Sequence, residues 1–234
     1  MAADPRRNRG LALVPSGFDP RIVGPEVLAF LRACRRVVPF HLGGGAALAG
    51  VHLHHRLSAD ADLFVHESDA HRDLVRALPA IGAACGLPVE LLQDAGSFVR
   101  ARLALSTGDI EVDVVFDAVP DLAPAPPPID GVVIESLLDL RVNKLTCILS
   151  RSEPRDLVDL LFLDHAGYPP EADLESALRK DAGVDPGVMA WLLGKFPVEP
   201  LPVMLVPLES SQLRAFRDDL RERFRRLAIP PSSD

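Results

Sequence analysis

Apolar residues recur at helical spacing near the start of the chain, with Val27, Leu31 and Cys34 on one face. Proline is well placed at a first helical position, so this pattern predicts a helix that begins at Pro25. A strand over residues 38–42 is predicted to follow. Helices and strands then alternate, which is typical of an α/β unit; the predicted segments are a helix over 46–54, a strand over 62–65 and a helix over 69–85.

The hydrophobic period changes after residue 98. Apolar and charged residues alternate over 99–105 and over 110–114, and Ser-Thr-Gly-Asp between them predicts the turn of a β-hairpin. Four prolines within 121–128 cannot continue a sheet and predict an extended connector. Beyond it the period is helical. A final amphipathic helix carries an apolar stripe, predicted to be core or a partner-docking face: Leu213, Phe216, Leu220, Phe224 and Leu227.

These patterns predict an α/β (α+β) domain with a small mixed sheet, followed by a mostly helical domain. The expected divisions are a flexible N-terminus over 1–20, the α/β domain over 21–120, the proline-rich connector over 121–131 and the helical domain over 132–234.

Composition narrows the class of protein. Of 234 residues, 48% are hydrophobic and 25% charged, which is ordinary for a globular protein, and the net charge of −8 argues against a broadly basic nucleic-acid binder. The net charge does not exclude a local basic groove. No signal peptide or membrane-length apolar run is recognisable, so we expect a cytoplasmic protein without a membrane partner. Three widely spaced cysteines suit reduced thiols better than disulfides or a zinc site.

Two carboxylates follow the glycine run at residues 43–45. Asp60 and Asp62 are two residues apart, so on a strand they share one face, roughly 6.5–7 Å apart along the backbone. Converging carboxylates repel unless a cation lies between them, and Mg²⁺ prefers oxygen ligands. Asp113 faces away from its apolar strand neighbours and joins the pair if the two strands are adjacent. It would then be a metal ligand or a general base.

The glycines supply the other half of the predicted site. Without a Cβ, Gly44 and Gly45 let backbone N–H groups approach an anion closely, and a helix starting at Ala46 would aim its positive end there. By itself, however, such a turn is often only a tight connection between a strand and a helix.

Together these residues resemble the nucleotidyltransferase superfamily, particularly the AbiEii/AbiGii-type toxin family. The resemblance covers about residues 38–163. Its elements are Gly44-Gly45, His55-Arg56-x-Ser58, Asp60-x-Asp62-Leu63-Phe64, Asp113, and the later group of Lys144, Arg151 and Arg155-Asp156-x-x-Asp159-Leu160.

The resemblance implies a polymerase-beta-like domain that transfers a nucleoside monophosphate from an NTP to an acceptor hydroxyl with one or two Mg²⁺ ions. It implies that Asp60, Asp62 and Asp113 are catalytic and bind metal. Gly44 and Gly45 would cradle phosphate and Lys144 would meet the triphosphate. Asp156 and Asp159 would orient the lysine or the base. It also implies an acceptor that is tRNA, another RNA or a protein, and an antitoxin partner.

The glycine turn departs from the family pattern. Relatives usually have a serine or threonine there, whereas this chain has Gly45 and Ala46, so activity could be reduced. The alternatives are a catalytically silent nucleotide- or RNA-binding module of the same fold, and a protein-interaction role of the last helix. In isolation, Lys144 and Arg151 would be expected on the solvated surface. We interpret His52, His54 and His55 as non-metal residues, because no further ligand completes a tetrahedral set. No motif selects among the four NTPs.

Overall fold

The computed structural model describes residues 17–229 of the chain. Residues 17–140 form one compact unit, the sheet unit, and residues 141–229 form a second one, the helical unit. Most of the predicted flexible N-terminus lies outside the described residues.

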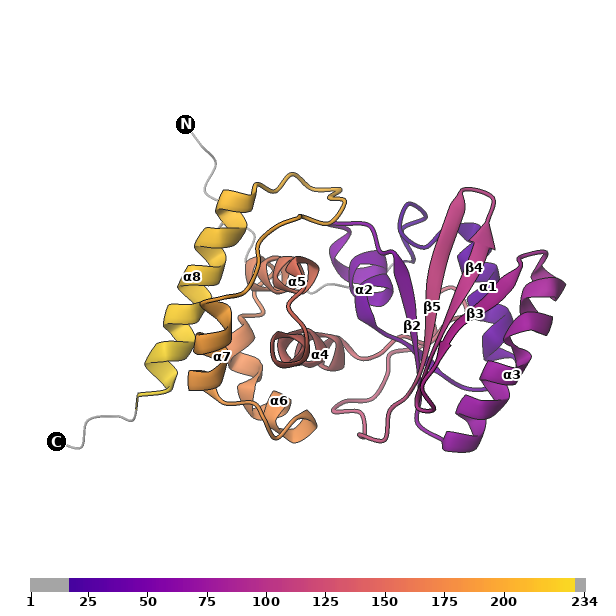
Figure 1. Cartoon of the computed structure of the whole chain (residues 1–234), viewed down its shortest axis with the longest axis horizontal. Coiled ribbons are helices and arrows are strands. Elements are labelled where there is room, and N and C mark those ends of the chain that lie inside the picture. Colours follow the sequence, from indigo (N-terminus) through magenta and orange to yellow (C-terminus); the bar gives the residue numbers. More distant parts are fainter. Residues whose placement is uncertain (1–16, 230–234) are drawn as a thin grey trace. The chain divides into compact units, whose positions relative to one another are not determined.

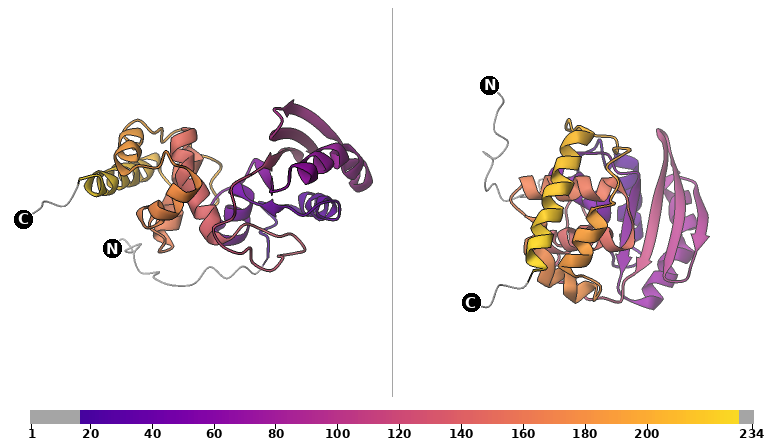
Figure 2. Two further views of the ribbon diagram at one scale, coloured as in Figure 1. Left: turned by 90° about the horizontal axis from the view of Figure 1, so that it is seen from below. Right: turned by 60° about the vertical axis from the view of Figure 1, so that its left-hand side comes forward.

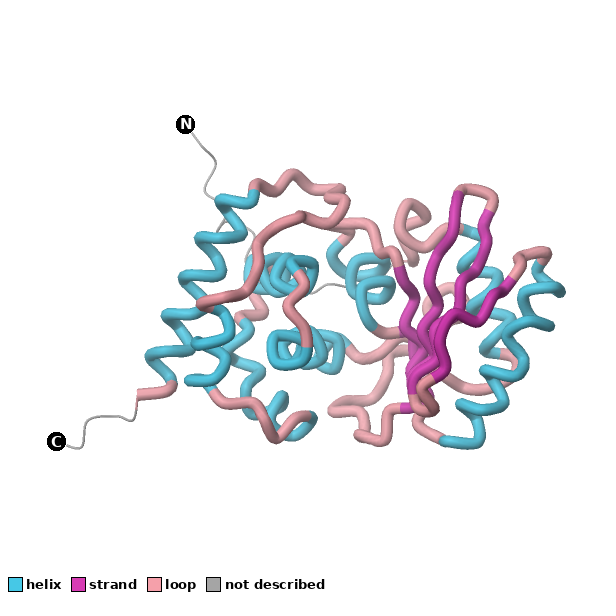
Figure 3. The backbone as a smooth tube through the Cα atoms, viewed as in Figure 1, coloured by secondary structure: helices cyan, strands magenta, loops and turns pink. Residues whose placement is uncertain are grey.

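The sheet unit is built on a five-stranded mixed sheet with the strand order β1-β2-β5-β4-β3 (Figures 1 and 3). β2 and β5 are parallel, and the other neighbours are antiparallel. This confirms the predicted fold class and hairpin. The strands are β1 (His41–Leu42), β2 (Asp60–Val65), β3 (Val89–Asp94), β4 (Phe98–Leu105) and β5 (Gly108–Phe116).

One face of the sheet carries the core of this unit. Alternate side chains along β2, β4 and β5 are apolar, and Leu63, Leu103 and Val114 among them are fully buried. Helices α1 (Pro25–Arg35) and α3 (Ser68–Cys85) lie on this face (Figures 1 and 2). Because side chains alternate along a strand, the polar residues between them point to the opposite face.

The helix after the glycines begins earlier than the sequence predicts. The predicted start was Ala46, but α2 (Gly44–Ala47) already includes two glycines, and a π-helix, η2 (Leu48–Leu53), continues it. The chain leaves η2 through His54 in the left-handed region, at a φ of 51°. Glycine has a low helix propensity. The close packing at this turn, described below, outweighs that low propensity.

Strand β3 is absent from the sequence prediction. Most of its side chains are exposed, including Leu91 and Leu92, so it shows no alternation of buried and exposed positions. It forms the sheet edge and pairs with β4 through a register shift between Leu91 and Gln93. An edge strand whose side chains are solvated on both faces has no hydrophobic period to detect.

The proline-rich connector belongs to the sheet unit. The backbone N–H groups of Leu122 and Ala123 donate to the buried carboxylate of Asp139, at 2.9 and 3.2 Å. Beyond the prolines, Ile134 is buried and forms a parallel bridge with Leu42 of β1. These contacts tie residues 132–140 to the sheet, and the compact units therefore divide within α4 (Leu137–Ser150), at residues 140 and 141, rather than at the connector.

The helical unit contains the rest of α4 and the later helices, of which α7 and α8 pack closely together. Four residues of the predicted stripe on α8 are buried, whereas Leu227 is 53% exposed, so this stripe is mainly core. No described helix is long and apolar enough to cross a membrane, and the three cysteines are free. The remaining helices are α5 (Pro154–His165), η3 (Pro170–Asp173), α6 (Leu174–Lys180), α7 (Pro186–Leu193) and α8 (Ser210–Leu227).

Candidate functional site

The glycine turn packs directly against the first acidic strand. Gly44 has a φ of +56°, and a Cβ there would overlap the carboxylate of Asp62. A Cβ at Gly45 would lie only 2.5 Å from Ser58 Oγ. Glycine is therefore required at residue 44 by both backbone conformation and space. The same contacts place the turn beside the carboxylate of Asp62.

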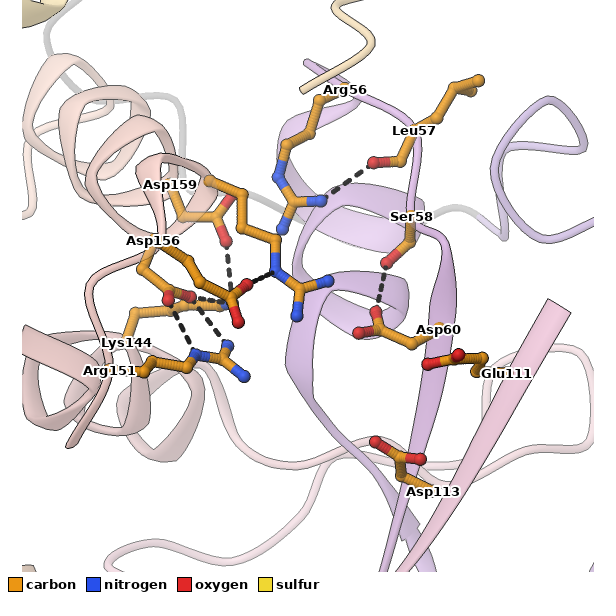
Figure 4. A network of polar contacts seen from close by, with 12 residues as sticks. Arg56, Leu57, Ser58, Asp60, Glu111, Asp113, Lys144, Arg151, Asp156 and Asp159 are labelled. Carbon is orange, nitrogen blue, oxygen red and sulfur yellow. Dashed lines mark hydrogen bonds and ion pairs between the residues drawn. The ribbon is translucent and has the colours of Figure 1, made fainter. Parts of the chain in front are cut away.

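The three predicted catalytic acids lie on one face of the sheet. β2 and β5 are adjacent and parallel, with Asp62 opposite Asp113 and Asp60 opposite Glu111. This confirms the predicted strand adjacency. Neighbouring strands are about 4.8 Å apart, so Asp62 and Asp113 leave the sheet side by side. Figure 4 shows Asp60, Glu111 and Asp113 on these strands; Asp60 is 7% and Asp113 3% exposed.

Two neighbouring side chains hold these acids in place. The hydroxyl of Ser58 donates to Asp60 Oδ1 at 3.1 Å. Arg100, opposite Asp113 in register on β4, donates from Nε to Oδ1 at 2.8 Å and from Nη2 to Oδ2 at 2.7 Å. Its hydrogen bonds to Asp113 raise the pKa of Arg100, with burial opposing and the charges of Asp113 and Glu111 adding to the rise. Arg100 thus stays charged and offsets part of the negative charge at this face.

Arg100, Glu111 and Glu135 were not among the predicted site residues. Glu135 is 2% exposed, and a Cβ at Gly43 would overlap its carboxylate, so this acid also lies beside the glycine turn. Arg100 alternates with the apolar residues of β4, which indicates that it faces away from the core. Its pairing with Asp113 depends on the register of the hairpin, which the alternation does not determine. Glu135 follows the connector, and nothing in its sequence spacing links it to the turn.

The sheet face that carries the three acids, here called the acidic face, offers ligand atoms that suit Mg²⁺. Asp60, Asp62 and Asp113 offer only carboxylate oxygens, and Mg²⁺ is held by one or two carboxylates together with water and phosphate oxygens. Both oxygens of Asp113 are engaged by Arg100. Each oxygen keeps a second lone pair, so a metal ion that uses Asp113 would share the carboxylate with the positive charge of Arg100.

The later predicted residues form a buried ionic cluster within the helical unit. Lys144 Nζ lies 3.0 Å from Asp156 Oδ1 and 2.9 Å from Asp159 Oδ2, and the guanidinium of Arg151 contacts both oxygens of Asp156 at 2.8 and 2.9 Å (Figure 4). Both aspartates are fully buried and Lys144 is 3% exposed. Lys144 is therefore not on the solvated surface where it would be expected in isolation, and its proposed contact with the triphosphate stays a prediction.

The ionic cluster keeps its charges despite burial. Burial by itself raises the pKa of the Asp156 carboxyl, but the charge of Lys144 and the hydrogen bonds and charge of Arg151 outweigh it, so the pKa lies below its ordinary value. Burial lowers the pKa of Arg151, and the hydrogen bonds to Asp156 reverse this effect and raise it. Asp156 and Arg151 therefore keep their charges in this ion pair between α4 and α5.

Known proteins with the same fold are nucleotidyltransferases. A crystal structure of a protein from H. pylori that is described as a putative nucleotidyltransferase superimposes with a TM-score of 0.53 at 18% identity, over 87% of this chain and 93% of that one. MenT4, a nucleotidyltransferase toxin from Mycobacterium tuberculosis H37Rv, superimposes with a TM-score of 0.55 at 16% identity, over 86% and 84%. At these identities the similarity shows the fold alone. No curated protein matches the sequence.

The family of the chain follows from its sequence. The family described as nucleotidyl transferase AbiEii toxin, of the Type IV toxin–antitoxin systems, matches residues 37–233. This range includes the glycine turn, the acidic face and the ionic cluster. The chain therefore belongs to the AbiEii nucleotidyltransferase toxin family, and it is a nucleotidyltransferase.

Proposed function

We propose that this protein transfers a nucleoside monophosphate from an NTP to an acceptor hydroxyl in a Mg²⁺-dependent reaction. The observation that carries the proposal is the register of β2 and β5, which sets Asp62 opposite Asp113. Together with Asp60, two residues earlier in β2, these acids give one sheet face the oxygen donors that Mg²⁺ prefers. The glycine turn beside Asp62 supplies a backbone that a phosphate can approach closely.

The residues of the acidic face have distinct roles in this proposal. Asp60, Asp62 and Asp113 would hold one or two Mg²⁺ ions, which supply charge neutralisation on the phosphates and a lower pKa of the acceptor hydroxyl. Asp113 would accept the proton of that hydroxyl. The acceptor oxygen forms a bond to the α-phosphorus, the bond from the α-phosphorus to the bridging oxygen breaks, and pyrophosphate leaves.

Contacts with the nucleotide are proposed separately for the glycine turn of the sheet unit and for the ionic cluster of the helical unit. Backbone N–H groups at Gly44 and Gly45 would contact phosphate oxygens. Lys144 would contact the triphosphate, with Asp156 and Asp159 fixing its position through the contacts at 3.0 and 2.9 Å. A lysine held by two buried carboxylates is already ordered, so less side-chain entropy is lost when it meets a phosphate.

The acceptor that we propose is an RNA, with a tRNA as the first candidate and a protein hydroxyl as the alternative. An antitoxin partner and a cytoplasmic location are proposed on the ground of family membership. Ser58 Oγ lies 2.5 Å from the position of a Cβ at Gly45, so its hydroxyl would replace the one that relatives usually carry in the turn only after releasing Asp60.

A catalytically silent nucleotide-binding module is the second candidate. The salt bridge of Arg100 with both oxygens of Asp113 favours it, since the guanidinium takes one lone pair of each oxygen and its positive charge opposes a metal ion or a proton at Asp113. Both candidates predict nucleotide binding, but only the transferase predicts a product.

The test is transfer of label from each of four α-³²P NTPs, with Mg²⁺, to total RNA and total protein of a cell extract. The native chain is compared with Asp62→Asn, and with Asp109→Asn as a control on the exposed start of β5. Label from native and control proteins, but not from Asp62→Asn, supports the transferase and identifies the nucleotide and the acceptor class. Nucleotide binding without labelled product in any lane supports the silent module.

A further inference from the structure

Two histidines and an aspartate converge at one end of the sheet unit, away from the residues assigned to catalysis. His41 lies in β1, His66 directly follows β2, and Asp121 lies at the start of the proline-rich connector. One ligand atom from each residue lies within 4.8 Å of the other two. His41 Nδ1 is 3.1 Å from Asp121 Oδ2, and His66 Nε2 is 3.3 Å from Asp121 Oδ1.

The register of the sheet brings the two imidazoles together. His41 pairs with Phe64 of β2, and His66 is two residues beyond Phe64, so both rings leave the same face. The ring centroids are 5.6 Å apart. Asp62 is on this face too, but four residues earlier, roughly 13 Å along the strand. The cluster therefore shares the face of the three acids but lies beyond them along β2, with His66 four residues and the partner of His41, Phe64, two residues from Asp62.

The hydrogen bond of His66 determines which of its nitrogens is available. Nδ1 lies 2.9 Å from the backbone carbonyl oxygen of Asp117, which can only accept, so Nδ1 carries the proton and donates. In a neutral ring Nε2 then presents a lone pair towards Asp121. A carbonyl behind a ligating histidine is the usual arrangement that fixes the tautomer in metal sites.

The contact between His66 Nε2 and Asp121 Oδ1 is consequently a contact between two lone-pair-bearing atoms. Both atoms are buried, as is His41 Nδ1, and none of the three has a hydrogen-bond partner within the described part of the chain. The distances from the two ring nitrogens to the Asp121 oxygens are those of hydrogen bonds, but the angles at these atoms are not. Two acceptors held at 3.3 Å repel each other unless a proton or a metal ion lies between them.

The spacing of the three atoms fits a metal ion. Zinc binds histidine nitrogen and aspartate oxygen at about 2.0–2.2 Å in tetrahedral sites, which places neighbouring ligand atoms roughly 3.3–3.5 Å apart. Two of the distances are already 3.1 and 3.3 Å, and the third, between the two ring nitrogens, is within 4.8 Å. Imidazole nitrogens also favour zinc and neighbouring transition metals over Mg²⁺.

We propose that His41, His66 and Asp121 bind one divalent transition-metal ion of the zinc class, with water completing the coordination. The site is independent of the function proposed above. Asp121 immediately precedes Leu122 and Ala123, whose N–H groups donate to Asp139. The metal ion would therefore link the beginning of the connector to strands β1 and β2, and its role would be to order the connector.

The test measures metal binding to the full chain, produced without a histidine tag and stripped with a chelator. Co²⁺ and Zn²⁺ are titrated into the native protein and into Asp121→Asn and His66→Gln. His54→Gln is the matched control, because His54 belongs to the same unit and is 42% exposed beside Asp19. Asp62→Asn controls for binding at the acidic face. Far-UV circular dichroism identifies variants that fold, and His41→Asn replaces either test variant that does not.

We expect one Co²⁺ per chain with the strong visible absorption of a low-coordinate site, displaced by Zn²⁺. Affinity should fall roughly tenfold or more in Asp121→Asn and His66→Gln and stay unchanged in the two controls. Zn²⁺ should also raise the midpoint of thermal unfolding in the native protein and not in Asp121→Asn. Absence of a bound ion in the native protein, or equal binding by Asp121→Asn and His66→Gln, overturns the proposal.

Discussion

Arg100 and Asp113, opposite each other on β4 and β5, form a two-point salt bridge with N–O distances of 2.8 and 2.7 Å. The carboxylate is 5% exposed and the guanidinium 33%. Bidentate pairs of this kind are among the stronger polar contacts in proteins. In the proposed reaction Asp113 binds metal or takes a proton, so Arg100 competes with both roles.

Replacing Arg100 by glutamine should therefore ease metal binding. We expect the Mg²⁺ concentration that half-saturates transfer to fall roughly tenfold, equivalent to about 1.4 kcal/mol, because the guanidinium no longer occupies the carboxylate. Mg²⁺ titration of the transfer rate measures it. Arg102→Gln, on the same strand and face but paired with Glu90, should behave like the native chain. An unchanged or higher Mg²⁺ requirement in Arg100→Gln would contradict competition.

Gly44→Ala should disrupt the turn more than its backbone strain explains. A Cβ there meets the Asp62 carboxylate in addition to a φ of +56°. Gly86 has a φ of +72° with open space around it, so Gly86→Ala provides a control for strain alone. We expect Gly86→Ala to cost about 1–2 kcal/mol in the free energy of unfolding and Gly44→Ala clearly more, with loss of transfer. Equal costs in urea unfolding would show that the predicted overlap is relieved.

Asp156→Asn should strongly destabilise the helical unit. It leaves the buried Lys144 and the partly exposed Arg151 with one carboxylate fewer, at a cost of about 3–5 kcal/mol. Asp218→Asn, which breaks an exposed ion pair on α8, should cost less than about 1 kcal/mol. Chemical denaturation at pH 7 measures both free energies of unfolding, and a small effect of Asp156→Asn would mean that the ionic cluster rearranges readily.

The same variant should change the response to acid. Because the pKa of Asp156 is below its ordinary value of 3.8, its stabilisation is complete above that value and is lost as the pH falls through the lower folded pKa. Below about pH 4 the native chain should therefore lose stability more steeply than Asp156→Asn. Parallel slopes for the two proteins would contradict this assignment.

His52 should make the free energy of unfolding depend on pH in a range above that of Asp156. Burial, followed by the charge of His54, lowers the pKa of His52 to about 4 from the ordinary 6.5, and neither ring nitrogen has a hydrogen-bond partner within the described residues. Between these values the unfolded chain binds a proton that the folded chain does not, so stability falls with the pH.

The loss attributable to His52 should reach about 2–3 kcal/mol at pH 4.5 relative to pH 7.5. His52→Leu should remove this part of the slope, and His165→Leu, at an exposed position on α5, should keep it. Urea unfolding at the two pH values compares the three proteins. An unaltered slope in His52→Leu would show that His52 is protonated in the folded chain.

Strand alternation was sufficient to predict the acidic face. Asp60 and Asp62 share a face by spacing alone, and Asp113 joins them because β2 and β5 are neighbours. The partner of Arg100 was not predictable, since it depends on the hairpin register. Lys144 was assigned to the nucleotide by resemblance, whereas its burial depends on how α4 and α5 pack.

Other features carry no local signal in the sequence. The exposed strand β3 lacks a hydrophobic period. The cluster of His41, His66 and Asp121 joins residues that are far apart in the chain and come together only through the pairing of β1 with β2 and the return of the connector. Such contacts follow from the tertiary structure and not from a motif.

The most direct test of the central claim is the Mg²⁺-dependent transfer rate of the native chain against Asp113→Asn, with Asp109→Asn at the exposed start of the same strand as the control. If Asp62 and Asp113 form the catalytic metal site, Asp113→Asn should fold normally and lose transfer by roughly a thousandfold or more, while the control retains it. Transfer by Asp113→Asn at the native rate would contradict the site.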